Sequence, residues 1–365
     1  MQQTPSYNRR IVTGVSQDSE MSKSVEMIIS EAERLGIEWL IVPNTTILEL
    51  THDGDTARFH RRIPPQTSSV AAYCCVNKQI TRNLLKDAGV TVSPGYFIVP
   101  SDTKKYRKEV YSALSKPLVV KPTDRSLDAN VTVNITSFGA YERAVARIYA
   151  DDPATSILVE EQFIGDEFRI VCTKEKVISI IKRVRPYVVG DGFSTIADLA
   201  KHKSEEHLSH LSGSLKPLLI DEQTRLYLSE QGLTSSSVPK NHETVYFQST
   251  TLSAIGRGGD TVEVLDEVHP SIHEIAVSAI QSVPGLAWGG IDFMCNDHTA
   301  KQTKNSYRLI EINASPELAW QEHPAIGESK NVIYAFLSVV FPSLRKNNRT
   351  SSVVFDGLET RTLAV

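Results

Sequence analysis

A chain of 365 residues with 41% hydrophobic content is long enough for two or three packed units, since domains usually contain about 100 to 200 residues. Its net charge of -4 at pH 7 provides no general attraction for nucleic acid or for an anionic membrane surface. We therefore expect neither as a partner, and any cationic binding site must be local.

The four cysteines show neither CxxC spacing nor metal-ligand spacing, and adjacent Cys74 and Cys75 are poorly placed to bridge each other. We expect reduced, buried thiols. The longest apolar-rich run, VIYAFLSVVF, is too short for a membrane helix, and the first residues lack the apolar core of a signal peptide. A cytoplasmic location is the resulting prediction.

The first segment alternates between strand and helix patterns. RIVTGV (10–15) predicts a strand, EMSKSVEMIISEAERLG (20–36) has apolar residues at helical spacing and stops at Gly36, and IEWLIVP (37–43) predicts a buried strand. ILELTHDGDTARFH (47–60) then alternates across an Asp-Gly turn, which indicates a hairpin.

The pattern from residue 77 predicts a small α+β unit that ends with the strand ILVEEQ (157–162). The strands FRIVCT and VISIIKRV, joined by the turn KEK, then open a further unit, whose last third alternates helix and strand up to the helix KNVIYAFLSVVF (330–341). Charged helical segments between Gly192 and Gly232 indicate an insertion, and its histidines are expected on a solvated helix face rather than in a metal cluster: His202, His207 and His210.

Three oxygen-bearing side chains fall on the last two predicted strands. Glu311 and Asn313 are two residues apart in YRLIEINA and so share one face, and Asp292 lies in the neighbouring strand WGGIDFMC. Polar residues at strand ends often face solvent only, but IEIN interrupts an apolar strand. Because Mg²⁺ takes few carboxylates and completes its shell with water and phosphate oxygens, we predict a magnesium site here.

Cationic residues stand at the ends of several predicted elements. Lys121 ends an apolar strand and Lys78 begins a helix, while three more cations crowd the end of VISIIKRVRP: Lys182, Arg183 and Arg185. Each alone is more often a surface charge. Together with the acidic strand ends they favour a nucleotide triphosphate.

The stretch LVEEQFIGDEFRI has acidic residues where a nucleoside would need acceptors. Glu160 and Glu161 end a strand, and Glu167 follows a glycine turn. An acidic loop between strands explains any one of them equally well, but an extended linker and a carboxylate also suit a purine amino group and a ribose.

Taken in order, these segments resemble the ATP-grasp ligases, and most closely the ATP-grasp domains of cyanophycin synthetase and of bifunctional glutathione synthetases. The resemblance covers about Arg61 to Pro342, and its most specific part is KRVRPYVVGDGFSTIADL; the other matching segments are NKQITRNLLKDAGV, VVKP, DEVHP, GGIDFMC and LIEINASPELAWQEHPAIGESKNV. It implies an α/β (α+β) ATP-grasp fold in three parts: an N-terminal pre-grasp domain (1–75), a small subdomain (76–156) and a C-terminal subdomain (157–345) with a helical insertion (192–232), followed by a tail (346–365).

The resemblance also implies roles for individual residues, with ATP and Mg²⁺ as cofactors and Mn²⁺ as a substitute. Lys78 and Lys121 match the lysines that hold ATP phosphates. Arg183 resembles the cation that faces the transferred phosphate, with Lys182 beside it and Arg257 of the IGRGGD loop as further catalytic candidates. The remaining matches are the adenine-lining Glu160 and Glu161, the ribose carboxylate Glu167, and the Mg²⁺ ligands Asp292, Glu311 and Asn313.

Two segments depart from the family pattern. The loop TDRSLDAN after Lys121 has no glycine, although relatives use glycine there so that backbone N–H groups can approach phosphate. Glu317 in NASPEL stands where relatives commonly have glycine near the acceptor site. The acceptor substrate is therefore expected to differ.

The resulting functional prediction is a carboxylate-amine ligase that forms an amide or peptide bond between small amino-acid-like substrates through an acylphosphate, releasing ADP and phosphate. Neither a glutamate-cysteine ligase module nor a GxxxxGK module is present in the sequence, which favours a stand-alone dipeptide ligase of natural-product biosynthesis. A glutathione-synthetase-like enzyme and a non-catalytic nucleotide-binding protein are the alternatives. Small amino acids or peptides, and a second copy in a homodimer, are the expected partners.

Overall fold

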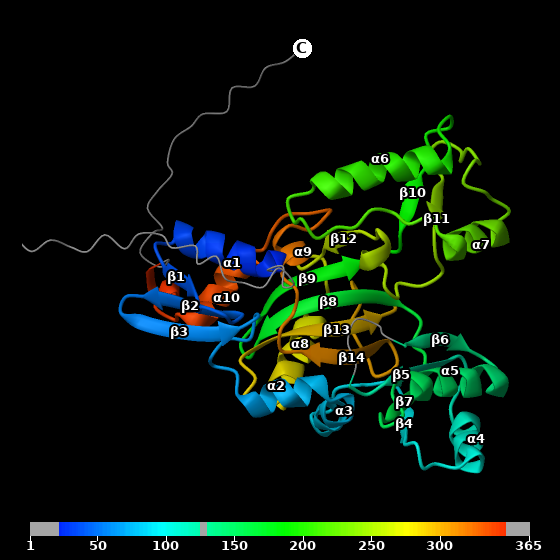
Figure 1. Cartoon of the computed structure of the whole chain (residues 1–365), viewed down its shortest axis with the longest axis horizontal. Coiled ribbons are helices and arrows are strands. Elements are labelled where there is room, and N and C mark those ends of the chain that lie inside the picture. Colours follow the sequence, from blue (N-terminus) through cyan, green and yellow to red (C-terminus); the bar gives the residue numbers. More distant parts are fainter. Residues whose placement is uncertain (1–21, 125–129, 348–365) are drawn as a thin grey trace, which may run out of the picture.

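The structure, a computed structural model, describes residues 22–124 and 130–347 (Figure 1). The strand predicted at 10–15, most of the loop after Lys121 and most of the predicted tail lie outside the described residues. No helix of the described part of the chain has both the length and the apolarity to cross a membrane. All four cysteines are free, and three of them are buried, as predicted: Cys75, Cys172 and Cys295.

The central element is a five-stranded antiparallel sheet with the strand order β12-β9-β8-β13-β14. One of its faces packs on three helices, among them α8 (Pro270–Ser282), and alternate apolar residues of its strands form the largest core there. The strands are β8 (Asp166–Thr173), β9 (Val177–Arg183), β12 (Thr261–Glu263), β13 (Trp288–Cys295) and β14 (Tyr307–Asn313), and the other two helices are α2 (Ser69–Val76) and α3 (Lys78–Asp87).

The N-terminal unit packs on the opposite face together with the C-terminal helices (Figure 1). Helix α1 (Lys23–Arg34) and a three-stranded antiparallel sheet share their core with Trp288 of β13 and Phe336 of α10. The sheet contains β1 (Glu38–Ile41), β2 (Ile47–His52) and β3 (Asp55–His60), and the last helices are α9 (Ala319–Glu322), α10 (Val332–Val340) and α11 (Leu344–Asn347).

The N-terminal hairpin is confirmed, because β2 and β3 pair across Asp53 and Gly54. The prediction that IEWLIVP forms a buried strand is wrong. β1 lies at the edge of its sheet, and Trp39 and Leu40 are exposed there.

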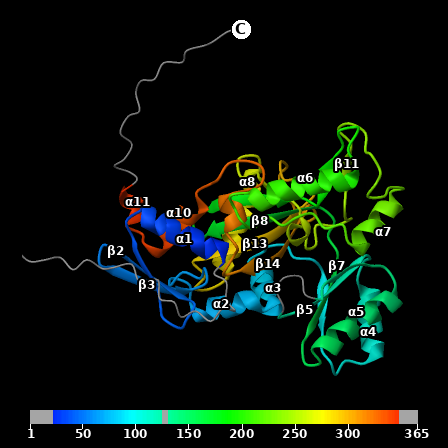
Figure 2. The ribbon, with the colours of Figure 1, turned by 45° about the horizontal axis from the view of Figure 1, so that its top comes forward.

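A second α/β unit lies to one side of the central sheet (Figures 1 and 2). It has the strand order β4-β7-β5-β6 and two covering helices, and its core is separate from the two described above. Its elements are β4 (Gly95–Ile98), α4 (Lys104–Ala113), β5 (Leu118–Pro122), β6 (Thr132–Ile135), α5 (Phe138–Asp151) and β7 (Ile157–Glu161).

The predicted insertion forms a lobe with its own small core (Figure 2). Its elements are β10 (Tyr187–Val189), α6 (Ile196–Ser209), α7 (Glu222–Glu230) and β11 (Thr244–Tyr246). Because the paired strands β10 and β11 flank the helices, the lobe is longer than the predicted range 192–232.

The prediction of a solvated face for all three histidines of the insertion is wrong for His207. This residue is 5% exposed, and its Nε2 lies 2.8 Å from Oδ1 of buried Asp260. Lys203 Nζ donates to the other oxygen of Asp260, at 2.7 Å. These contacts attach α6 to the segment that precedes β12.

Candidate functional site

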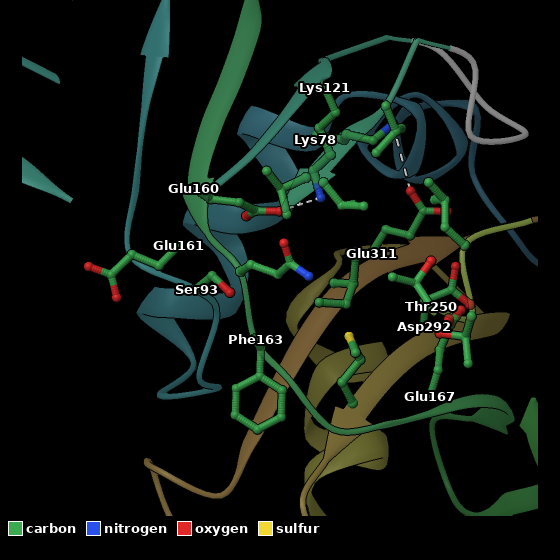
Figure 3. A pocket seen from close by; sticks show the side chains of 18 of the residues that line it. Lys78, Ser93, Lys121, Glu160, Glu161, Phe163, Glu167, Thr250, Asp292 and Glu311 are labelled. Carbon is green, nitrogen blue, oxygen red and sulfur yellow. Dashed lines mark ion pairs between the residues drawn. The ribbon is translucent and has the colours of Figure 1, made fainter. Parts of the chain in front are cut away.

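A pocket opens between the second α/β unit and the central sheet, on the face opposite α8 (Figure 3). Both charged and apolar side chains line it. The apolar residues are Val119, Pro122, Val131, Val133, Phe163, Leu252, Met294 and Ile310. A flat, uncharged group such as a nucleobase fits between the apolar walls, with its charged substituents toward one end.

One end of the pocket contains a buried ionic cluster from β5, β7 and α3. Lys121 Nζ lies 2.5 Å from Glu160 Oε1, and Arg82 Nη1 donates to Glu160 Oε2 at 2.8 Å. Arg82 also donates to the carbonyl of Ser93. Lys121 comes to this position because β5 and β7 are antiparallel neighbours, with Val119 opposite Glu160.

Lys78 occupies the first position of α3. The Asn77 side chain caps this helix by accepting hydrogen bonds from the N–H groups of Gln79 and Ile80, and the Lys78 N–H donates to the carbonyl of Thr123. The start of α3 is thereby attached to the end of β5. Lys78 Nζ lies 3.6 Å from Glu311 Oε2 across the pocket (Figure 3).

The predicted oxygen trio is brought together by the register of β13 and β14. Asp292 lies directly opposite Glu311, and Asn313 Nδ2 donates to Glu311 Oε1 at 3.0 Å. Asp292 and Glu311 line the pocket (Figure 3). The deduction that Glu311 and Asn313 share one face of the strand is confirmed.

Arg169 of β8, in the quoted stretch LVEEQFIGDEFRI, was not singled out from the sequence. It lies opposite Asp292 in the register of β8 and β13, and its Nε lies 2.9 Å from Asp292 Oδ1. Arg183 Nη2 lies 3.4 Å from the same oxygen. The only signal in the sequence was its spacing: Arg169 is two residues after Glu167 and so faces the same side of β8.

The charges around the two carboxylates affect them differently. Burial raises the pKa of Asp292 above its usual range, against the opposing effect of the nearby Arg169 and Arg183. Burial also acts to raise the pKa of Glu311, but the Lys78 ammonium and Arg169 outweigh it and hold this pKa at about 2. Glu311 is therefore ionised at neutral pH.

The two carboxylates and the amide fit a hard divalent cation. Asp292 Oδ1 is buried, and within the described residues it has ion-pair contacts with Arg169 and Arg183 but accepts no hydrogen bond, so its hydrogen-bonding capacity is not used by the protein. Carboxylate and amide oxygens are the ligands that Mg²⁺ prefers. Asp292, Glu311 and Asn313 are thus the residues that could hold this metal.

Glu167 and Arg183 face each other across β8 and β9, form an ion pair, and both line the pocket. Glu160 and Glu161 follow each other on β7, so their side chains point in opposite directions (Figure 3). Glu161 Oε1 accepts a hydrogen bond from the N–H of Ser115, at 2.8 Å, outside the pocket. Glu160 and Glu161 both line the pocket, and because the Glu161 carboxylate is bound by Ser115, its backbone is the part that could contact a nucleobase.

Lys182 and Arg257 need a correction, because the structure brings neither of them to the pocket. Lys182 is next to Arg183 on β9 and so faces the other side of the sheet, where its Nζ lies 2.6 Å from Asp166 Oδ2. Arg257 ends the short helix η1 (Ile255–Arg257) and faces the insertion. Its Nη1 and Nη2 donate to the two carboxylate oxygens of Asp221, at 2.8 and 2.9 Å.

Arg257 acts on the pocket through Gln248. The Arg257 Nε donates to the Gln248 side-chain oxygen at 2.9 Å, and Gln248 Nε2 donates to the carbonyls of Thr250 and Leu252. Thr250 and Leu252 line the pocket. Arg257 therefore positions a pocket wall instead of contacting a ligand.

Replacing Arg257 by methionine should leave the buried Gln248 oxygen without its donor. We expect the free energy of unfolding to fall by about 1 to 2 kcal/mol, and the affinity for nucleotide to fall with it, because the wall at Thr250 loosens. Urea denaturation and calorimetric titration of Mg²⁺-ATP measure the two effects. The control is Arg225→Met at an exposed position of α7, which should change neither the stability nor the nucleotide affinity. If Arg257→Met also left both quantities unchanged, Arg257 would not position the pocket wall.

A known protein structure is similar to this chain over most of its length. A crystal structure of a bifunctional glutathione synthetase from Pasteurella multocida superimposes with a TM-score of 0.70 at 24% sequence identity, covering 89% of this chain and 44% of that one. The chain therefore has the ATP-grasp fold, as predicted. No protein-family model matches the sequence.

The similar sequences are all larger proteins. The chain is 26% identical over 328 residues to the glutathione biosynthesis bifunctional protein GshAB of Clostridium perfringens, and 27% identical over 332 residues to the cyanophycin synthetase of Geminocystis herdmanii. These matches cover 88% and 89% of this chain, but only 41% and 37% of the relatives. The predicted resemblance to these two kinds of protein is confirmed.

Proposed function

We propose that this chain is an ATP-dependent carboxylate-amine ligase. The observation that carries the proposal is the pocket itself, in which Lys78 of α3 and Lys121 of the second α/β unit lie on one side, and Asp292 and Glu311 of the central sheet lie on the other. The names of the similar proteins, a synthetase and a glutathione biosynthesis protein, support the same class of reaction. The chain matches less than half the length of these relatives, so their activities are not transferred to it directly.

In this reaction the carboxylate of one substrate attacks the γ-phosphate of ATP, which gives an acylphosphate and ADP. The amine of the second substrate then attacks the acyl carbon, and phosphate leaves. The chain's residues supply charge and position rather than a nucleophile. Mg²⁺ held by Asp292, Glu311 and Asn313 would neutralise phosphate charge.

Each group of residues then has one task. Lys78 and Lys121 bind phosphate oxygens, Glu167 accepts hydrogen bonds from the ribose, and the strand around Glu160 lines the base. Arg183, which lines the pocket next to Asp292, faces the phosphate being transferred. These assignments are part of the proposal.

A dipeptide ligase that joins two amino acids is the specific form we favour. Glu317, in the loop after β14, supports a distinct substrate. Its carboxylate accepts a hydrogen bond from Ser24 Oγ of α1, and its Oε2 lies 3.4 Å from Arg62 Nη1, so the loop is attached to the N-terminal unit. A ligase that adds glycine to a γ-glutamyl dipeptide is the second candidate, which the similarity to GshAB favours.

The test is to incubate the purified chain with Mg²⁺-ATP and a matrix of amino acids and small peptides in pairs. Release of ADP and phosphate that depends on both substrates, with a product whose mass is that of the pair less one water, would establish ligation. Phosphate release without a condensed product, or no turnover with any pair, would contradict the proposal and favour a nucleotide-binding protein.

Lys121→Ala should weaken nucleotide binding about tenfold or more, because a charge-assisted contact to phosphate contributes about 1.5 to 3 kcal/mol. Glu160 keeps its pairing with Arg82 in this variant. Calorimetric titration with Mg²⁺-ATP measures the loss, with exposed Lys105→Ala on α4 as the control. Unchanged affinity in a folded Lys121→Ala protein would exclude the role.

A further inference from the structure

Arg185, in the connection between β9 and β10, differs from the other cationic residues around the pocket. Lys121, Arg169 and Arg183 each pair with a carboxylate, and so do the two residues that lie outside the pocket, Lys182 and Arg257. Within the described residues, Arg185 forms no ion pair with a carboxylate. Among residues 22–124 and 130–347, no carboxylate thus neutralises the charge of Arg185.

An aromatic ring and backbone carbonyls hold Arg185 instead. The guanidinium carbon lies 3.8 Å from the centroid of the Tyr246 ring, and Tyr246 is fixed by its pairing with Tyr187 in the β10-β11 ribbon. Arg185 Nη1 also makes long contacts of 3.3 and 3.5 Å with the carbonyls of Gln248 and Ser249. Stacking fixes the plane of a guanidinium while its edge stays available to a planar anion.

The position of Arg185 places it beside the charged end of the pocket. Arg183, two residues earlier, lines the pocket, and so does Thr250, the residue after Ser249. The strand pairing continues at this point, since the N–H of Val184 donates to the carbonyl of Asp260. The connection from β9 to β10, which contains Arg185, thus runs from the central sheet to the insertion lobe (Figure 1).

This location favours the substrate over the nucleotide as the ligand. The base-lining strand β7 and the phosphate-binding candidates Lys78 and Lys121 belong to the second α/β unit and α3, whereas Arg185 is on the side of the insertion lobe. A guanidinium edge matches a carboxylate in two parallel hydrogen bonds. Amino acids and peptides carry such a carboxylate in addition to the groups that react.

We propose that Arg185, stacked on Tyr246, binds a substrate carboxylate that the reaction leaves intact. The inference rests on the proposed function. It restricts the substrates to pairs in which one partner carries a carboxylate that does not take part in bond formation. That carboxylate belongs either to the acyl donor, as in a dicarboxylic amino acid, or to the amine substrate, as its own carboxyl group.

The kinetic test compares each acid with its carboxamide, using a pair that the ligation assay identifies. In one arm the acyl donor is replaced by its analogue with a carboxamide at the unreactive carboxylate. In the other arm the same change is made in the amine substrate. In the wild-type protein we expect one of these replacements to raise KM about tenfold or more. The arm in which this occurs identifies the source of the carboxylate.

Arg185→Gln should raise KM for that acid by a similar factor and remove the difference between acid and amide. The kcat and the KM for ATP should stay within about twofold, because Arg185 is not among the residues that line the nucleotide pocket. Tyr246→Phe, which keeps the ring, should behave like the wild type, and Tyr246→Leu should raise KM for the acid. Arg58→Gln on β3, a matched change far from the pocket, is the control.

A binding measurement separates a failure of this inference from a failure of the ligase proposal. L-Glutamate, L-glutamine, glycine and glycinamide are titrated by calorimetry into the protein with Mg²⁺ and a non-hydrolysable ATP analogue. If no pair is ligated but an acid binds the wild type about tenfold tighter than Arg185→Gln, the ligase proposal fails and the carboxylate subsite stands. Equal behaviour of acid and amide, equal affinity of both proteins, or no carboxylate binding to the wild type would overturn the subsite.

Discussion

Glu311→Gln is expected to lower the turnover of the ligation reaction by about 100-fold or more while the protein stays folded and still binds the adenine end of ATP. The substitution keeps the size of the side chain and its hydrogen bond with Asn313, but it removes a charge that is ionised at neutral pH. The charge is needed most as phosphoryl transfer develops, and one well-placed electrostatic group typically contributes a factor of about 100 to 1,000. Steady-state release of ADP measures the effect.

Two further measurements make this expectation specific to metal binding. High concentrations of Mg²⁺ or Mn²⁺ should restore part of the activity, because a weakened metal site is filled by mass action. Glu175→Gln in the turn between β8 and β9 should be silent, since Glu175 is exposed and pairs only with Arg345 among the described residues. Product formation by Glu311→Gln at the wild-type rate with limiting Mg²⁺ would show that this carboxylate is not a metal ligand.

Arg82→Met is expected to produce the largest loss of stability. The side chains of Arg82 and Glu160 are 4% and 6% exposed. Glu160 keeps only Lys121 as a partner in this variant, and losing a buried hydrogen bond between charged groups costs about 1.5 to 3 kcal/mol. The carbonyl of Ser93 loses its donor in the same variant. Urea denaturation should show the decrease, accompanied by weaker ATP binding because Lys121 and Glu160 are then held less firmly.

The control for Arg82 is an ion pair on the surface. Arg34→Met removes the partner of Glu31 on α1, where solvent screens the charges, and no measurable change in stability is expected. If Arg82→Met were as stable as Arg34→Met, the buried cluster around Glu160 would not contribute to folding.

The sequence alone was sufficient for the longer strands and helices around the site, and for residues whose spacing along a single strand decides their direction. Periods of two and of 3.6 residues predicted β8, β9, β13, β14 and the helices around them. The same period of two placed Glu311 and Asn313 on one face of β14, where they contact each other. The face of a strand on which a side chain lies follows from backbone geometry, so residues close in the sequence are enough to predict it.

Which side chains point into the pocket, by contrast, was decided by the tertiary structure. Lys182 and Arg183 are adjacent cations that the sequence treats alike, and only the position of the pocket on one face of the central sheet separates them. Arg257 has the chemistry of a catalytic cation, but Asp221 of the insertion lobe binds it away from the pocket.

The burial of Arg169 beside Asp292 likewise depends on the register of β8 and β13, strands separated by more than 100 residues of chain. Pairing across such a distance depends on how whole sheets pack, which no local pattern records. The sequence by itself therefore determined which residues could bind a nucleotide and a metal, and the packing of the two sheets and the insertion lobe decided which of them face the same pocket.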